Sequence, residues 1–240
     1  MATLMSTPDK PRYPELLSLA VHEFRTPASV VGGYLRMLQR DGESLTDRQR
    51  KMVDEAEKSC ARIVALISEL SDVAKLDAGL ITLNRQPLDV FALLSEVAEL
   101  VQEGKEREVR LDLRGEPAGA TIAGDAARLR SAFDAVFRAI LREKAGPCVI
   151  VGERRYESRD GQTSAVIVVA EEQSVQAAYD SAPGAFDEKR GGLGLALPLA
   201  RRVVEGVGGR IWSPLKQEGG DDAFARGSVI MSFPITESNR

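Results

Sequence analysis

LLSLAVHEFRTPASVVGGYLRML, residues 16–38, carries the pattern that decides the fold of the first third of this chain. Its apolar residues are separated alternately by four and three positions, which is the spacing of one face of an α-helix. They are Leu17, Val21, Phe24, Ala28, Val31, Leu35 and Leu38. A face that repeats over three heptads is typical of a helix packed in a bundle. We therefore predict a long helix that ends at Asp41–Gly42.

A second helix with the same spacing is predicted after Thr46. Thr46 and Gln49 have the spacing of a capping box, and Gly79 supplies a C-terminal stop. The apolar face is wide, because one stripe runs beside another. The first stripe is Met52, Ala56, Ser59, Ile63, Leu66, Leu70 and Val73, and the second is Val53, Cys60, Ile67 and Ala74. Two antiparallel helices cannot surround such a face, so we expect a homodimer that forms a four-helix bundle.

From residue 80 onward the pattern changes to short strands and helices. We predict helices at 87–106, 125–142 and 194–207, and strands at 81–83, 109–113, 121–123, 149–156, 164–170, 210–213 and 229–234. Such a mixture without strict βαβ alternation favours an α/β sandwich with helices on one face of a mixed sheet. The expected organisation is a disordered leader at 1–13, a helical hairpin at 14–79 and an α/β domain at 80–240.

The composition excludes several function classes. The 32 basic and 36 acidic residues are interspersed and give a net charge of −4, which argues against a nucleic-acid partner. No apolar run approaches the roughly 20 residues that span a bilayer, and residues 1–14 lack a signal-peptide core. We expect no direct membrane contact and a cytoplasmic location. The two cysteines have no metal-ligand spacing, so no metal site is predicted.

The residues after Val21 carry the chemistry. His22 is the only histidine of the chain, and it follows directly on an apolar position, so its ring is predicted at the edge of the bundle. Glu23 can hydrogen-bond one ring nitrogen and leave the other as a free nucleophile, which suits acceptance of a phosphoryl group. Pro27 has no N–H to donate and loosens the helix just after this pair. The alternative is a surface histidine with an incidental glutamate beside it.

The hexapeptide HEFRTP, residues 22–27, resembles the H-box of sensor histidine kinases, and residues 70–79 are similar to the end of that family's second helix. This resemblance implies that the hairpin is a dimerisation and histidine phosphotransfer domain. His22 would be phosphorylated and Glu23 would activate it as an acid/base. Thr26 would position water for dephosphorylation of a response-regulator receiver aspartate, and Arg25 would contact that partner.

The resemblance also implies a Bergerat-type ATPase fold for the second domain, whose metal-binding helix should follow Asp125, Arg128 and Leu129. The family places two asparagines on this helix, one of them a magnesium ligand. Matching from Arg128 puts Ala135 and Ala139 at those positions. Alanine offers no oxygen to a hard cation, so the metal ligand of the family is missing here.

The family's glycine-rich boxes are retained unequally. Glu171 matches the carboxylate that reads adenine, but Gln173 and Val175 stand where glycines are expected. Gly192 and Gly194 belong to a better-preserved turn, GGLGLAL at residues 191–197, although Ala196 replaces one glycine. Such a turn can cradle phosphate at a helix start, or it can simply pack a helix against a sheet. The segment 176–190 between these boxes is shorter than the usual ATP lid.

Three functions follow from this pattern. The first is phosphotransfer through His22 to or from a receiver aspartate in a phosphorelay, or dephosphorylation of that aspartate through Thr26, with ATP binding lost and no cofactor. The second is a divergent histidine autokinase that uses ATP and Mg²⁺. The third is a pseudokinase adaptor that dimerises and binds a response regulator without catalysis.

Overall fold

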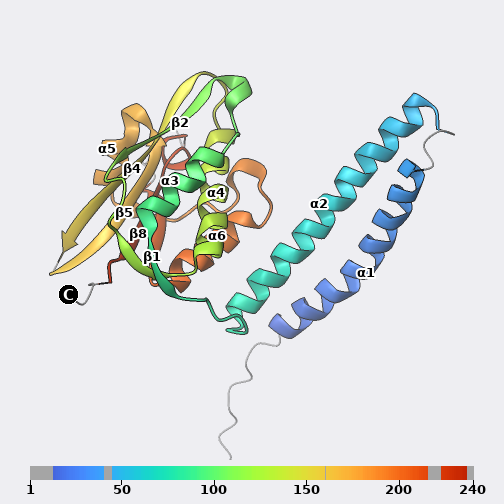
Figure 1. The fold of residues 1–240 in the computed structure, drawn as a ribbon, viewed down its shortest axis with the longest axis horizontal. Coiled ribbons are helices and arrows are strands. Elements are labelled where there is room, and N and C mark those ends of the chain that lie inside the picture. Colours follow the sequence, from blue (N-terminus) through green and yellow to red (C-terminus); the bar gives the residue numbers. More distant parts are fainter. Residues whose placement is uncertain (1–12, 41–44, 160, 216–222, 237–240) are drawn as a thin grey trace, which may run out of the picture. The chain divides into compact units, whose positions relative to one another are not determined.

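The computed structural model describes residues 13–40, 45–159, 161–215 and 223–236, and the chain separates into two compact units, Met1–Thr82 and Leu83–Arg240 (Figure 1). The expected disordered leader falls outside the described residues except for Tyr13, which begins the first helix. The predicted helix end at Asp41–Gly42 also lies outside them.

The first unit is the predicted antiparallel hairpin of α1 (Tyr13–Arg40) and α2 (Asp47–Asp77). The capping box is confirmed: Thr46 N donates to Gln49 Oε1 over 2.9 Å, and Thr46 Oγ1 accepts from Gln49 N over 3.4 Å. Gly79 ends α2 with a φ of 67°. This left-handed residue lets Leu80 N donate to Lys75 O over 2.8 Å, so the last carbonyls are satisfied.

The apolar residues of the hairpin divide between two faces. On α1 the series Val21, Ala28 and Leu35 is buried or half-buried, whereas Phe24, Val31 and Leu38 are exposed. On α2 the predicted second stripe is the buried one, and the first stripe is exposed over its first four residues, Met52, Ala56, Ser59 and Ile63. The hairpin therefore covers one apolar face by itself and leaves another open.

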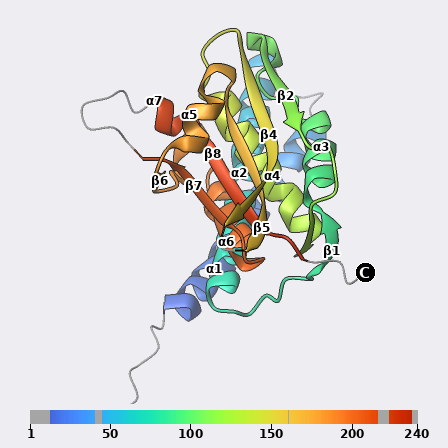
Figure 2. The ribbon, with the colours of Figure 1, turned by 90° about the vertical axis from the view of Figure 1, so that its left-hand side faces the viewer.

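The second unit is built on a mixed six-stranded sheet in the order β2-β4-β5-β8-β7-β6 (Figure 2). Its strands are β2 (Val109–Gly115), β4 (Cys148–Arg159), β5 (Gln162–Glu171), β8 (Val229–Pro234), β7 (Arg210–Pro214) and β6 (Pro183–Gly184). β2 and β4 are parallel, and every other neighbouring pair is antiparallel. A separate small sheet pairs β1 (Gln86–Asp89) with β3 (Thr121–Gly124).

Helices cover both faces of the large sheet. α3 (Val90–Leu100), α4 (Ala126–Arg142) and α6 (Ala196–Gly206) lie together on one face, where Phe133 of α4 meets Phe233 of β8 edge-on at 6.0 Å (Figure 1). The short α5 (Val175–Asp180) and α7 (Ala223–Arg226) pack on the opposite face. β5 is consequently buried on both sides from residue 165 to residue 170.

The fold class is as predicted, and three details of the prediction are wrong. Residues 81–83 form no strand, because they have no neighbouring strand to pair with. The helix predicted at 87–106 is only Val90–Leu100: Pro87 pairs within β1, and Asp89 caps α3 by accepting from the backbone N–H groups of Phe91 and Ala92. Residues 105–107 form a separate 3₁₀ turn, η2. The helices are also not confined to one face, because α5 covers the other.

Candidate functional site

His22 lies in the middle of α1 with its side chain 77% exposed. Its Nδ1 is 3.4 Å from Oε1 of Glu23, whose side chain is also largely exposed. A neutral ring that donates its Nδ1 proton to this carboxylate keeps the lone pair on Nε2. In this tautomer the exposed pair can present Nε2 to the surroundings as a nucleophile.

The backbone at His22 is anchored by the preceding residue, Val21. Val21 is buried against the hairpin interior, while Arg25 and Thr26 are exposed, with Thr26 one helical turn after His22. Pro27 lies inside α1 and supplies no N–H to the preceding turn. The structure thus brings His22, Glu23 and Thr26 onto one accessible stretch of helix, as the sequence predicted.

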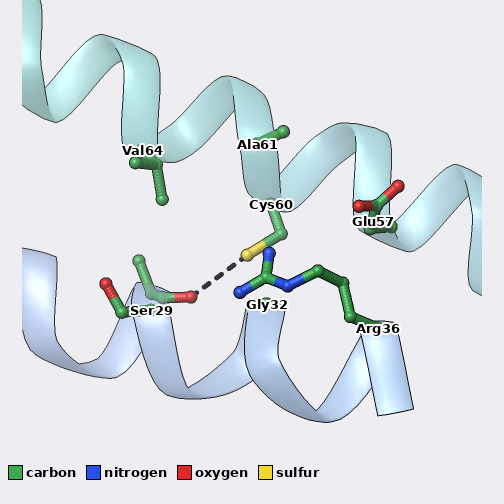
Figure 3. A pocket seen from close by; sticks show the side chains of 8 residues that line it. Ser29, Gly32, Arg36, Glu57, Cys60, Ala61 and Val64 are labelled. Carbon is green, nitrogen blue, oxygen red and sulfur yellow. Dashed lines mark hydrogen bonds between the residues drawn. The ribbon is translucent and has the colours of Figure 1, made fainter. Parts of the chain in front are cut away.

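A groove between α1 and α2 opens beside this stretch (Figure 3). Its volume is about 270 Å³, and small residues form much of it. It is lined by Ala28, Ser29, Gly32, Arg36, Glu57, Cys60, Ala61 and Val64. Inside it the Cys60 thiol donates to the Ala28 carbonyl over 3.2 Å. A Cβ placed on Gly32 would lie 3.3 Å from Cys60 Sγ, so glycine at this position allows the close approach of the two helices.

The groove lies on the same face of α1 as His22. His22, Ser29 and Arg36 are spaced by seven residues, close to two full turns, so they share a face. Phe24 is two residues from His22, roughly 200° around the helix, on the open apolar face. Ser29 and Arg36 were not among the predicted site residues, although their seven-residue spacing from His22 indicates that they share its face.

The two alanines at the predicted metal positions are buried on α4. Asp125 caps this helix by accepting from Arg128 N over 3.2 Å, and Ala135 and Ala139 face the interior. The glycine turn lies directly on Ala139: a Cβ on Gly191 would be 2.7 Å from the Ala139 Cα. Gly191 N–H donates to Glu143 Oε1 over 3.2 Å.

Glu171, at the predicted adenine-reading position, is engaged within the protein. Its Oε2 accepts from Lys144 Nζ over 2.9 Å, and its Oε1 accepts from Gln173 Nε2 over 3.1 Å. Burial raises the pKa of the nearby Cys148 thiol; the Glu171 carboxylate raises that pKa further, and Lys144 opposes it. Val175, at the second glycine position, begins α5 and is buried in the apolar cluster on the far face of the sheet.

A buried arginine that the sequence analysis did not single out holds the segment before the glycine turn. Arg190 is 1% exposed, and its guanidinium donates to the carbonyls of Asp187, Arg226 and Ser228 and to the Ser213 hydroxyl. The face of Phe186 lies 5.2 Å from the same guanidinium. Gly192 and Gly194 follow with positive φ angles of 59° and 65°. Glycine is therefore required here by the path of the turn.

The described residues contain no group of three or more His, Cys, Asp or Glu side chains that could hold a metal ion. No helix within them has the length and apolar character needed to cross a bilayer.

Comparison with known proteins identifies the hairpin and its relatives. Residues 15–79 match the His Kinase A (phospho-acceptor) domain. The chain is 28% identical over 212 residues to the sensor protein GacS of Pseudomonas syringae pv. syringae, an alignment covering 82% of this chain and 23% of GacS. It is 28% identical over 209 residues to the histidine-protein kinase BarA of Escherichia coli K12, covering 82% of this chain and 22% of BarA. The chain therefore spans under a quarter of the length of these relatives.

Solved structures share the whole architecture. ShkA, crystallised full-length with AMPPNP, superposes with a TM-score of 0.66 at 22% identity, over 94% of this chain and 47% of ShkA. The histidine kinase ThkA, crystallised with the response regulator TrrA, superposes with a TM-score of 0.54 at 16% identity, over 95% of this chain and 64% of that one. Both contain the helical pair and the α/β unit. Residues 15–79 therefore belong to the phospho-acceptor domain family of histidine kinases, and the whole chain shares the fold of these solved histidine kinases.

Proposed function

We propose that His22 exchanges a phosphoryl group with the aspartate of a response-regulator receiver domain, and that the α/β unit does not charge it from ATP. The observation that carries this proposal is the contrast between the two sites. His22 is exposed and lies beside Glu23, whereas Glu171 is paired with Lys144 and the Gly191 backbone is bonded to Glu143 and packed on Ala139.

The transfer step needs only the residues at the exposed pair. The Nε2 lone pair of His22 attacks the phosphorus of the aspartyl phosphate, an N–P bond forms, and the P–O bond to the aspartate breaks to release its carboxylate. The Nδ1 proton stays on the ring, where the Glu23 carboxylate accepts its hydrogen bond and stabilises the positive charge that develops. The reverse reaction returns the phosphoryl group to a second receiver domain.

The groove of Figure 3 supports docking of that partner beside His22. It lies on the same face of α1 as His22, and Arg36 and Glu57 in its lining offer one charge of each sign, with the Arg36 guanidinium lying beside Gly32. Specific orientation of a partner by such charges is a common use of rim residues. We propose that the receiver domain covers this groove while its aspartate reaches His22.

The residues present do not fit magnesium and ATP. Ala135 and Ala139 offer no oxygen ligand. The Gly191 backbone occupies the space beside Ala139, Glu171 is paired with Lys144, and Val175 is part of the core. Opening this site would break an ion pair and expose buried apolar surface, so we propose that the chain works without a nucleotide cofactor.

A second copy of the chain is the proposed cover of the open apolar face. Phe24, Val31 and Leu38 recur every seven residues on α1, on a different side from His22, and each is exposed. Among the described side chains of α1, eight large apolar ones are exposed, which exceeds what isolated surface residues explain. Burying them in a four-helix bundle leaves the face that carries His22 and Ser29 free for the partner.

The transfer is tested by mixing the chain with a receiver domain that carries labelled aspartyl phosphate. Label should arrive on the wild-type protein and be absent from a His22→Gln variant, which leaves the hairpin folded because this side chain is exposed. Release of label as free phosphate by the wild type, lost in Thr26→Ala but kept in His22→Gln, would identify a phosphatase instead. Binding of the receiver domain without transfer of label to the protein and without release of free phosphate would identify an adaptor.

Calorimetric titration with ATP and Mg²⁺ tests the proposal that the α/β unit does not charge His22 from ATP. We expect no binding in the micromolar range. Micromolar affinity followed by labelling of His22 from ATP would contradict it and identify an autokinase.

A further inference from the structure

The far margin of the large sheet contains a short stretch of strand that no other strand covers. β7 pairs with β8 along Arg210–Trp212 on one side. On its other side β6 pairs only with Ser213 and Pro214. Among the described residues, the outer edge of β7 at residues 210–212 therefore has no strand partner. Such an edge presents backbone N–H and C=O groups that can add another strand.

A slot of about 380 Å³ follows this open edge. Its lining comes from both faces of the sheet, since Trp212 belongs to the cluster on the α5 face, while Arg201 and Glu205 come from α6 on the other. The complete lining is Pro183, Gly184, Ala185, Phe186, Arg201, Glu205, Arg210, Ile211 and Trp212. The slot thus begins where the chain leaves β6 after Gly184, and it runs along the vacant position beside β7.

The charged residues of the slot favour a negatively charged side chain on an incoming segment. Arg201 is held by Glu188 at 2.6 Å and by Glu205 at 3.9 Å. Arg210 is exposed, lies 5.5 Å from the centroid of the Trp212 ring, and has no acidic partner among the described residues. A cation that is held over an aromatic ring without a counter-ion is complementary to a carboxylate. Trp and Arg are also the residue types that dominate binding hot spots.

We propose that this edge docks an extended segment of a partner protein by strand addition, with an acidic side chain opposite Arg210. If the segment continues β6 antiparallel to β7, its successive residues lie opposite Trp212, Ile211 and Arg210. Side chains along a strand alternate between the two faces of the sheet. In a segment of alternating polar and apolar residues, the acidic and polar side chains then lie on the face of Arg210 and Trp212, and the apolar side chain lies on the face of Ile211. The site is independent of His22.

The probe is the synthetic peptide acetyl-Thr-Val-Glu-Val-Thr-amide, which presents the same side chains in either strand direction. Trp212 is the only tryptophan of the chain, so its intrinsic fluorescence reports occupancy without a label. We expect a saturable fluorescence change and slower amide hydrogen exchange at residues 210–212. The lysine peptide acetyl-Thr-Val-Lys-Val-Thr-amide should bind at least about tenfold more weakly, because like charges meet at Arg210.

Arg210→Glu should reverse this preference, weakening the glutamate peptide and favouring the lysine peptide. Arg110→Glu is the matched control, since Arg110 is an exposed arginine on β2 at the opposite edge of the same sheet; it should leave both affinities unchanged. Near-ultraviolet circular dichroism verifies that each variant is folded. The proposal is overturned if the glutamate peptide shows no saturation up to about 1 mM, if Arg210→Glu leaves the preference intact, or if protection appears outside residues 210–212.

Discussion

The helical hairpin and the α/β unit differ in how far their apolar and reactive side chains are exposed. The hairpin leaves Phe24, Val31 and Leu38 in solvent, and its reactive His22 is exposed. The α/β unit buries Val175 and engages Glu171 and Gly191 internally. The hairpin therefore leaves apolar surface and a reactive side chain open, whereas the α/β unit packs or pairs Val175, Glu171 and Gly191 with its own residues.

This contrast has a physical origin. Two helices offer too little surface to enclose a wide apolar face, so part of that face stays exposed on this hairpin. A six-stranded sheet with helices on both faces can bury its core, and Val175, where the resemblance implies a glycine, adds a side chain to that core. The burial of Val175 therefore contributes to the stability of the α/β unit.

The largest effect is expected on the open face of the hairpin. Replacing both Phe24 and Val31 with glutamate removes about 3–6 kcal/mol of apolar burial from each protomer of the proposed dimer, which raises the dissociation constant of the dimer more than about 100-fold. Sedimentation velocity measures this change. The matched control is Ser29→Glu with Arg36→Glu on the other face, which should remain dimeric. Equal dissociation of both variants would show that the two faces are not distinct.

In the α/β unit, Gly191→Ala is expected to lower the free energy of unfolding by about 2–4 kcal/mol. Its φ of 68° disfavours any side chain, and the new Cβ would lie 2.7 Å from Ala139 Cα. Gly192→Ala shares the left-handed backbone but has nothing within 4 Å, so it should cost only about 1–2 kcal/mol. Denaturant unfolding measures the loss of unfolding free energy in both variants, and the difference between the two losses is the contribution from packing of the turn on α4. Equal losses would mean that this packing is loose.

Ala139→Asn restores a side-chain oxygen at the predicted metal position. We expect this variant to lose about 1–3 kcal/mol of stability, because the longer polar side chain must fit against Gly191, and to bind no Mg²⁺–ATP in a calorimetric titration. Ala127→Asn on the exposed side of α4 controls for helix propensity, which accounts for about 0.7 kcal/mol at most. Nucleotide binding by Ala139→Asn without loss of stability would show that the site is open rather than filled.

The smallest effect concerns the start of α2. Thr46→Ala removes the hydroxyl that accepts from Gln49 N, and we expect a loss of about 1 kcal/mol in thermal or urea unfolding. Thr46→Ser retains the oxygen and should unfold like the wild type. Both are compared at one protein concentration, because association also stabilises the hairpin. A loss of similar size in Thr46→Ser would assign the effect to the methyl group instead of the cap.

Prediction from the sequence succeeded where the signal was local. The hairpin, its capping box and the helix predicted at 125–142 follow from residue spacing, and all three are present. It failed at residues 81–83, where an apolar, β-prone stretch has no neighbouring strand, and at Pro87, which pairs with Ala123. Those outcomes depend on which strands meet, and a local pattern carries no information about that.

The same division holds for the function. The sequence alone determined that His22 and Glu23 stand on an amphipathic helix, because this is a statement about residue identity and helical period. It also put alanines, Ala135 and Ala139, at the two positions where the family resemblance implies asparagines. Only the tertiary structure decided that Gly191 rests on Ala139, that α5 covers the far face of the sheet, that a groove follows His22 along α1, and that β7 keeps an open edge. Each of these depends on contacts between residues far apart in the chain, and close packing determines which of those contacts form.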